Sequence, residues 1–145
     1  MTATGPDLGT RETVARRDAY TCVRCGNPAD AAWDGHSIHH RRLRSHPWPG
    51  LHDPANLITL CGSGTTGCHG HVHAHPKEAR ENGWIVSAHQ DRPETVPVLT
   101  ARHGWVLLDR NGGRTPCTRG GEPTGPTIDQ LTRLRAMSRQ DGDAE

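Results

Sequence analysis

The sequence predicts a small α+β domain with a short β-rich C-terminal extension, and three observations support this. Helical and strand-like segments are mixed along the first 87 residues. The chain has 145 residues, 32% of them hydrophobic, with one Tyr and no Phe, so it can bury only a modest core. Two cysteine pairs, Cys22 with Cys25 and Cys61 with Cys68, frame a histidine-rich stretch, and such pairs typically build structural zinc sites. Zinc contributes on the order of 10 kcal/mol of folding free energy, so we expect a zinc-stabilised fold.

The N-terminal third is predicted to contain a tail, a helix and a cysteine knuckle. Residues 1–9 are polar and contain Gly and Pro, which predicts a disordered tail. Thr10 is a suitable N-cap for the helix that follows. The helix leads into Cys22-Val23-Arg24-Cys25-Gly26, where the glycine allows the tight turn that brings backbone amides towards the thiols.

Two strands and two short helices follow. The patterns at 37–41 and 57–61 predict strands, joined by a long loop rich in Pro, His and Gly. A helix is predicted to begin at Cys68. A second begins near Pro76 and ends at Asn82-Gly83, where glycine permits a left-handed stop.

The remaining residues predict a small sheet and a last helix. Strand candidates lie at 84–87, 96–99 and 105–108, and we expect them to cover the metal-binding core. Residues 127–130 resemble a capping box that opens a C-terminal helix. The predicted division is a core at 10–83, a β extension at 84–118, and a C-terminal helix and tail at 119–145.

Charge and compartment restrict the functions. The net charge of +1 is not that of a typical nucleic-acid binder, but 16 of the 17 basic residues are arginine, and guanidinium groups match phosphate geometry. A solvated arginine face is the alternative. Neither a signal peptide nor an apolar run of membrane-spanning length is recognisable, so we expect a cytoplasmic protein with reduced cysteines that bind metal, and with Cys117 unpaired. The arginines of the first third are Arg11, Arg16, Arg17, Arg24, Arg41, Arg42 and Arg44.

The cysteines and histidines carry a family resemblance. The ordered motifs are Cys22-x-x-Cys25, His39-His40, Asn56-Leu57, Cys61 and Cys68-His69. Together they resemble the HNH endonuclease family, and the loop from Leu60 to Gly70 is similar to HNH proteins of actinobacterial phages and prophages. The resemblance covers roughly residues 11–87. It implies a ββα-metal fold of the treble-clef-like, His-Me finger type with a zinc knuckle.

The resemblance also implies roles for individual residues. His40 would be the general base. Asn56 would orient the strand that carries it through hydrogen bonds to backbone, with direct metal contact as the alternative. His39, His69 and His73 would hold a catalytic divalent ion. The four cysteines would hold structural zinc, while Arg41, Arg42 and Arg44 would contact nucleic-acid phosphates, with a hydrated strand edge as the alternative for these arginines.

The adjacent histidines raise a geometric difficulty. Consecutive residues of a regular strand point to opposite faces, so His39 and His40 would not both reach one phosphate from an ideal strand. The family places this pair at an irregular strand end. We therefore expect a local departure from regular pairing at these two residues.

The implied activity is metal-dependent hydrolysis of double-stranded DNA. We expect nicking or double-strand cleavage with low sequence specificity, and 3′-hydroxyl and 5′-phosphate products. The resemblance suggests phage genome packaging with terminase as a partner, with homing, restriction and defence as the alternative roles. Three imidazoles suit Mn²⁺, Co²⁺, Ni²⁺ or Zn²⁺ better than Mg²⁺, although the family suggests Mg²⁺ or Mn²⁺. The alternative is a non-catalytic zinc-knuckle module that binds nucleic acid or protein. A nucleobase deaminase is disfavoured because the chain lacks His-x-Glu and Pro-Cys-x-x-Cys.

Overall fold

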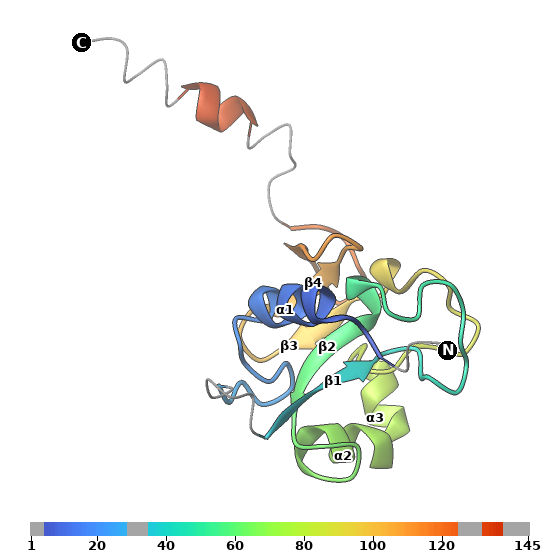
Figure 1. Cartoon of the computed structure of the whole chain (residues 1–145). Helices are drawn as coiled ribbons and strands as arrows, with labels where there is room; N and C mark the ends of the chain where they lie inside the picture. The colour runs from blue at the N-terminus through green and yellow to red at the C-terminus, as the bar shows by residue number, and fades with distance from the viewer. Residues whose placement is uncertain (1–4, 29–34, 125–131, 138–145) are drawn as a thin grey trace.

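The computed structural model of the protein describes residues 5–28, 35–124 and 132–137. It has a two-stranded sheet, β1-β2, and a three-stranded sheet, β3-β4-β5, which together with the helices make a small α+β structure, as predicted (Figure 1). Short 3-10 turns precede β2 and β3. The elements are α1 (Leu8–Arg17), β1 (His36–His40), β2 (Leu57–Cys61), α2 (Gly67–Ala74), α3 (Pro76–Glu81), β3 (Val98–Thr100), β4 (Gly104–Leu108) and β5 (Arg114–Pro116).

Helix α1 begins at Leu8, three residues before the Arg11 start that an N-cap at Thr10 predicts. The Asp7 carboxylate accepts the backbone N–H of Thr10 at 2.7 Å, so Asp7 is the N-cap and the prediction of Thr10 was wrong. Asp and Thr are both good caps, and the cap at Asp7 adds Leu8, Gly9 and Thr10 to the helix. The helix therefore starts inside the segment predicted to be a disordered tail. Val14 and Ala15 are buried on the side of α1 that packs against β2.

Strands β1 and β2 form a regular antiparallel hairpin. His36 lies opposite Cys61, and the register continues without interruption to His40 opposite Leu57. The predicted departure from regular pairing at His39 and His40 is therefore wrong. The hairpin lies between α1 and α2 in Figure 1, and β2 contacts both helices.

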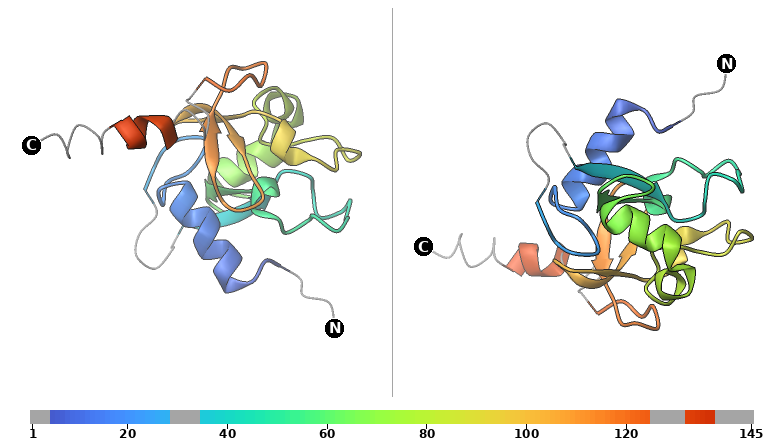
Figure 2. Two further views of the ribbon diagram at one scale, coloured as in Figure 1. Left: turned by 90° about the horizontal axis from the view of Figure 1, so that it is seen from above. Right: turned by 90° about the horizontal axis from the view of Figure 1, so that it is seen from below.

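The C-terminal extension shares one core with the N-terminal part. Trp84, Val98 and Val106 belong to the same buried cluster as Leu60 and Val72, so the predicted boundary at residue 83 runs through a single core. Figure 2 shows the extension packed against the rest of the described domain.

The strands of the extension differ in part from the prediction. Strands β3 and β4 form close to the predicted positions, and β5 is an additional edge strand. The predicted strand at 84–87 is instead irregular. Its backbone N–H groups bond elsewhere, Trp84 to the Ala79 carbonyl and Val86 to the Arg41 carbonyl, at 2.8 and 2.9 Å.

Arg41 joins the hairpin to the extension and cannot bind DNA. Its side chain is fully buried, and burial lowers its pKa to about 9. The predicted phosphate contact of Arg41 is therefore wrong, because the buried guanidinium donates four hydrogen bonds to backbone carbonyls inside the protein. The four acceptors are the carbonyl oxygens of Gly83, Ala55, Pro93 and Val96, at 2.7–3.0 Å.

Residues 132–137 are helical, with Leu134 and Met137 exposed. The capping box predicted at 127–130 lies outside the described residues. Among the helices that the structure describes, none is long and apolar enough to cross a membrane.

Candidate metal sites and the cavity beside them

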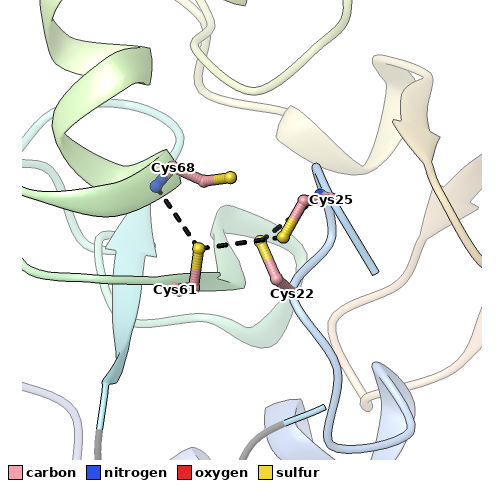
Figure 3. Close-up of side chains that lie close together, drawn as sticks. All are labelled: Cys22, Cys25, Cys61 and Cys68. Atoms are coloured by element: carbon pink, nitrogen blue, oxygen red, sulfur yellow. Dashed lines mark hydrogen bonds between the residues drawn. The ribbon is translucent and has the colours of Figure 1, made fainter. Parts of the chain in front are cut away.

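The four cysteines of the two predicted pairs come together. Cys22 and Cys25 lie on the turn after α1, Cys61 ends β2, and Cys68 lies in the first turn of α2 (Figure 3). Their sulfur atoms all lie within 4.8 Å of one another, and the Sγ atoms of Cys25 and Cys61 are 3.8 Å apart. A tetrahedral zinc ion with Zn–S bonds of ~2.3 Å separates its sulfurs by about 3.8 Å. The cluster could therefore bind a structural metal such as zinc.

The surroundings of the cysteines also suit a cation. Burial raises the pKa of Cys22 to about 12, so this thiol would become a thiolate only beside a positive charge. The backbone N–H groups of Cys25 and Cys68 lie 3.5 and 3.4 Å from the sulfurs of Cys22 and Cys61. Arg24 Nη1 lies 3.3 Å from the sulfur of Cys68. These donors would stabilise bound thiolates, which supports a closed structural site.

Three histidines form a second cluster between β1 and α2. His39 comes from β1, while His69 and His73 come from α2. One nitrogen from each ring can be chosen so that all three atoms lie within 4.8 Å of one another. Residues four apart lie on one helix face, which explains why His69 and His73 are together. His71 points elsewhere and bonds Glu78 at 2.8 Å.

The rings of His39, which is buried, and His69, which is half-buried, are neutral near pH 7. Burial, together with the neighbouring His69, lowers the pKa of His39 to about 3. Burial and His73 lower the pKa of His69 to about 4. Both rings therefore have a lone pair available for a metal ion without first losing a proton.

A cavity of about 550 Å³ lies beside the histidine cluster. Its lining includes all three clustered histidines and also His40, Arg44 and Arg11. The cysteine cluster does not line this cavity. The two clusters therefore differ in access, since only the histidines face a space that a ligand could enter.

His40 lies outside the three-histidine cluster and has a different partner. Its Nε2 is 3.0 Å from Nδ1 of His52, and burial, His52 and Arg44 lower its pKa to about 4. His39 and His40 line the same cavity although they alternate along a regular strand. Among the described strands β1 pairs only with β2, so its other edge is open and side chains from both faces can border one cavity.

Asn56 makes the backbone contacts that the sequence analysis anticipates. Its side chain is fully buried, and Oδ1 accepts the N–H of Arg42 at 2.7 Å. Its Nδ2 group donates to the carbonyls of Leu51 and Arg42 at 2.9 and 3.3 Å. These bonds fix the chain just after His40, and Asn56 is not a member of either cluster.

The other two predicted arginines differ in exposure. Arg42 lies over the Trp48 ring at 4.4 Å and donates to the carbonyl of His46 at 2.9 Å, so it mainly supports the loop after β1. Arg44 is exposed and lines the cavity. Arg11, on α1, is also exposed at the cavity, although the sequence analysis did not select it for the site.

The structure adds Ser37 and His52 to the neighbourhood of the clusters. Ser37 bonds His69, and its position two residues before His39 on a strand was a usable signal, because such residues share a face. His52 lies in an irregular loop, twelve residues from His40. No periodicity in the sequence relates His52 to His40.

No protein-family model matches this chain, and no curated protein or solved structure matches it either.

Proposed function

We propose that the protein is a metal-dependent HNH-type endonuclease that hydrolyses phosphodiester bonds in double-stranded DNA. The observation that carries this proposal is one cavity shared by a three-imidazole cluster and a fourth imidazole, His40, that is not part of it. The order of β1, β2 and α2, with His39 on the first strand and two histidines on the helix, agrees with a ββα-metal unit. A cysteine cluster at the end of that hairpin agrees with the associated zinc knuckle.

The donor set indicates which ions would fit. His39, His69 and His73 offer neutral nitrogen ligands, which favour Mn²⁺, Co²⁺, Ni²⁺ or Zn²⁺ over the oxygen-preferring Mg²⁺. Three ligands beside a cavity leave room for substrate, as in catalytic sites. An ion held there would supply Lewis-acid stabilisation of the charge that develops on the phosphate and the departing 3′ oxygen.

His40 would accept the proton of the attacking water. Its lowered pKa keeps the ring neutral near pH 7. When His40 donates its Nε2–H to Nδ1 of His52, the lone pair of His40 lies at Nδ1, and that atom takes the proton. The water oxygen bonds to phosphorus as the P–O3′ bond breaks, and the departing 3′ oxygen takes a proton from solvent, which leaves a 3′-hydroxyl and a 5′-phosphate.

The arginines at the cavity favour a phosphate-containing polymer as substrate. Arg11 and Arg44 come from separate segments and both border the cavity, where they would contact backbone phosphates. Phosphate contacts carry no sequence information, so we expect low specificity and either nicking or double-strand cleavage. From the same resemblance we propose a role in the bacterial host cytoplasm, in phage genome packaging beside a terminase.

A plasmid cleavage assay tests this proposal. We expect the wild type to convert supercoiled plasmid to nicked or linear DNA with Mn²⁺, Co²⁺ or Ni²⁺. His40→Ala should reduce the rate about 10²- to 10⁴-fold, the usual contribution of a general base, while DNA binding persists. His89→Ala, at an exposed residue outside the cavity lining, is the matched control and should cleave as the wild type does. Equal cleavage by wild type and His40→Ala would reject the assignment of the base.

A non-catalytic zinc-knuckle module that binds nucleic acid is the second candidate. The observation in its favour is that the cysteine cluster is complete without any histidine. Tight DNA binding without cleavage under any of these ions would establish this candidate in place of the nuclease.

A further inference from the structure

The hydrogen bonds behind the histidine cluster determine which ring nitrogens are available to a metal. A neutral imidazole has one N–H and one lone pair, and a partner that binds one nitrogen decides which atom has the proton. His69 and His39 each have such a partner, the hydroxyl of Ser37 for His69 and the backbone carbonyl of Trp84 for His39. Their ligand atoms can therefore be derived from chemistry alone.

Ser37 lies between a carbonyl oxygen and His69. Its Oγ is 2.8 Å from the Gly62 carbonyl oxygen and 2.6 Å from Nδ1 of His69. A hydroxyl has a single proton and a carbonyl oxygen can only accept, so Ser37 donates to Gly62 and must accept from His69. This bond requires the proton of His69 on Nδ1, which leaves the lone pair on Nε2.

His39 is held in the opposite tautomer by backbone. Its Nε2 lies 2.8 Å from the carbonyl oxygen of Trp84, an acceptor, so the proton lies on Nε2 and the lone pair on Nδ1. Trp84 is itself fixed, because its backbone N–H donates to Ala79 at 2.8 Å and its indole N–H donates to Leu99 at 2.9 Å. The irregular segment that replaces the predicted strand thus supplies a rigid acceptor.

We propose that Ser37 is a positioning residue that sets the tautomer of His69, so that the cluster presents Nε2 of His69 and Nδ1 of His39 to its ion. The inference rests on the proposed metal site and extends it to a residue beyond the ligands. Groups that bind the second nitrogen of a metal-ligating histidine typically change metal affinity about 10- to 100-fold.

The Ser37 bridge also connects the two clusters. Gly62 follows Cys61 and His69 follows Cys68, so each end of the bridge is one residue from a cysteine of the first cluster. Gly62 has φ of 85°, and a Cβ there would lie 2.1 Å from the Thr66 carbonyl oxygen, so only glycine fits. A metal held by the cysteines would therefore also fix the acceptor that orients Ser37.

Two measurements on the full chain, with zinc in the cysteine cluster and the histidine cluster stripped by chelator, test the proposal. Long-range ¹H–¹⁵N NMR should show His69 protonated on Nδ1 and His39 on Nε2. Co²⁺ titration should then give about 10- to 100-fold weaker binding for Ser37→Ala than for wild type. Ser37→Thr, which keeps the hydroxyl, should bind Co²⁺ within about threefold of wild type and preserve the tautomer of His69.

The outcomes separate this inference from the proposed function. His69→Ala is the reference variant, and if it binds Co²⁺ as the wild type does, the histidine cluster is not the metal site and the proposed function fails. If His69→Ala binds weakly but Ser37→Ala binds normally, or if His69 has its proton on Nε2, the role of Ser37 is overturned. Equal losses in Ser37→Ala and Ser37→Thr with an unchanged His69 tautomer would mean that packing alone is responsible, which also overturns it.

Discussion

The cysteine cluster and the histidine cluster have similar dimensions but different surroundings. In each, the candidate ligand atoms lie within 4.8 Å of one another. The cysteines come from the turn after α1, the end of β2 and the start of α2. Cys22 and Cys68 are buried and Cys25 is exposed, and none of the four borders the cavity. The histidines come from β1 and α2, and all three line the cavity.

This difference indicates that two properties distinguish a structural metal site from a reactive one. One is the choice of ligands, and the other is whether a substrate can reach the ion from the cavity. Four thiolates complete a tetrahedral ion and leave no position for a substrate. Three imidazoles beside a cavity leave coordination positions open. The comparison therefore predicts that loss of a cysteine affects folding and loss of a histidine affects chemistry.

Replacing a cysteine should have the largest effect. Cys68→Ser removes one thiolate from a cluster whose ion is expected to contribute on the order of 10 kcal/mol, so we expect loss of bound zinc and of cooperative unfolding. Metal analysis and thermal unfolding followed by circular dichroism measure both. Cys117→Ser is the matched control, because Cys117 is a free, buried cysteine outside the cluster and its variant should retain zinc. A folded, zinc-free Cys68→Ser protein would contradict the structural role.

Replacing an exposed histidine ligand should remove metal binding and leave the fold intact. His73→Ala is expected to weaken Co²⁺ binding by more than about 100-fold, beyond the usual effect of an outer partner, and to abolish cleavage. Because His73 is exposed, thermal unfolding without added Co²⁺ should match the wild type within about 2 °C. His75→Ala, an exposed histidine on the same segment and outside the cluster, should bind Co²⁺ normally. A large drop in melting temperature for His73→Ala would remove the distinction between the clusters.

The sequence predicted the clusters better than their surroundings. Ligand spacing reports directly on proximity, as with Cys22-x-x-Cys25 and the four-residue step from His69 to His73, and the structure brings both sets together. The spacing does not show which group forms a hydrogen bond with the second ring nitrogen of a histidine, the one that does not bind metal. That depends on Ser37 and on the backbone of Trp84, which are fixed by tertiary packing.

Arg41 shows why neighbours of a predicted base can mislead. Its position after His40 suggested a phosphate contact, but its side chain, like that of His39, reaches the backbone that follows α3: Arg41 bonds the Gly83 carbonyl and His39 bonds the Trp84 carbonyl. There Arg41 satisfies carbonyls from segments up to 55 residues away. The strand predicted at 84–87 is wrong for a related reason. The backbone N–H groups of Trp84 and Val86 donate to the carbonyls of Ala79 in α3 and of Arg41, so they are not available to a neighbouring strand.

Replacing His52 tests the role of His40 separately from metal binding by the histidine cluster. Its bond to Nε2 of His40 fixes the ring, so His52→Ala should lower the cleavage rate about tenfold, a fraction of the full contribution of a general base. The affinities for Co²⁺ and DNA should stay within about twofold, because His52 does not belong to the metal cluster. His46→Ala, at an exposed residue of the same loop, is the control and should cleave normally. Weaker Co²⁺ binding by His52→Ala would show that the loop supports the metal cluster and not the base.

The smallest expected effect is the pH dependence of metal binding at the histidines. Ordinary histidines titrate near pH ~6.5, so each would weaken metal binding about tenfold at pH ~5.5 through competition with protons. Burial and neighbouring rings lower the pKa of His39 to about 3 and that of His69 to about 4. A lowered pKa keeps a ring neutral as the pH falls, so these two ligands should contribute almost no loss of affinity.

With zinc already in the cysteine cluster, we expect Co²⁺ affinity to fall about tenfold or less between pH ~7.5 and ~5.5, whereas three ordinary imidazoles would lose about a thousandfold. Calorimetry in buffers of different ionisation enthalpy should detect correspondingly little proton release. A thousandfold loss would mean that the rings titrate as exposed histidines do. The histidine cluster would then be more open than its buried members imply, and the contrast with the cysteine cluster would depend on ligand number alone.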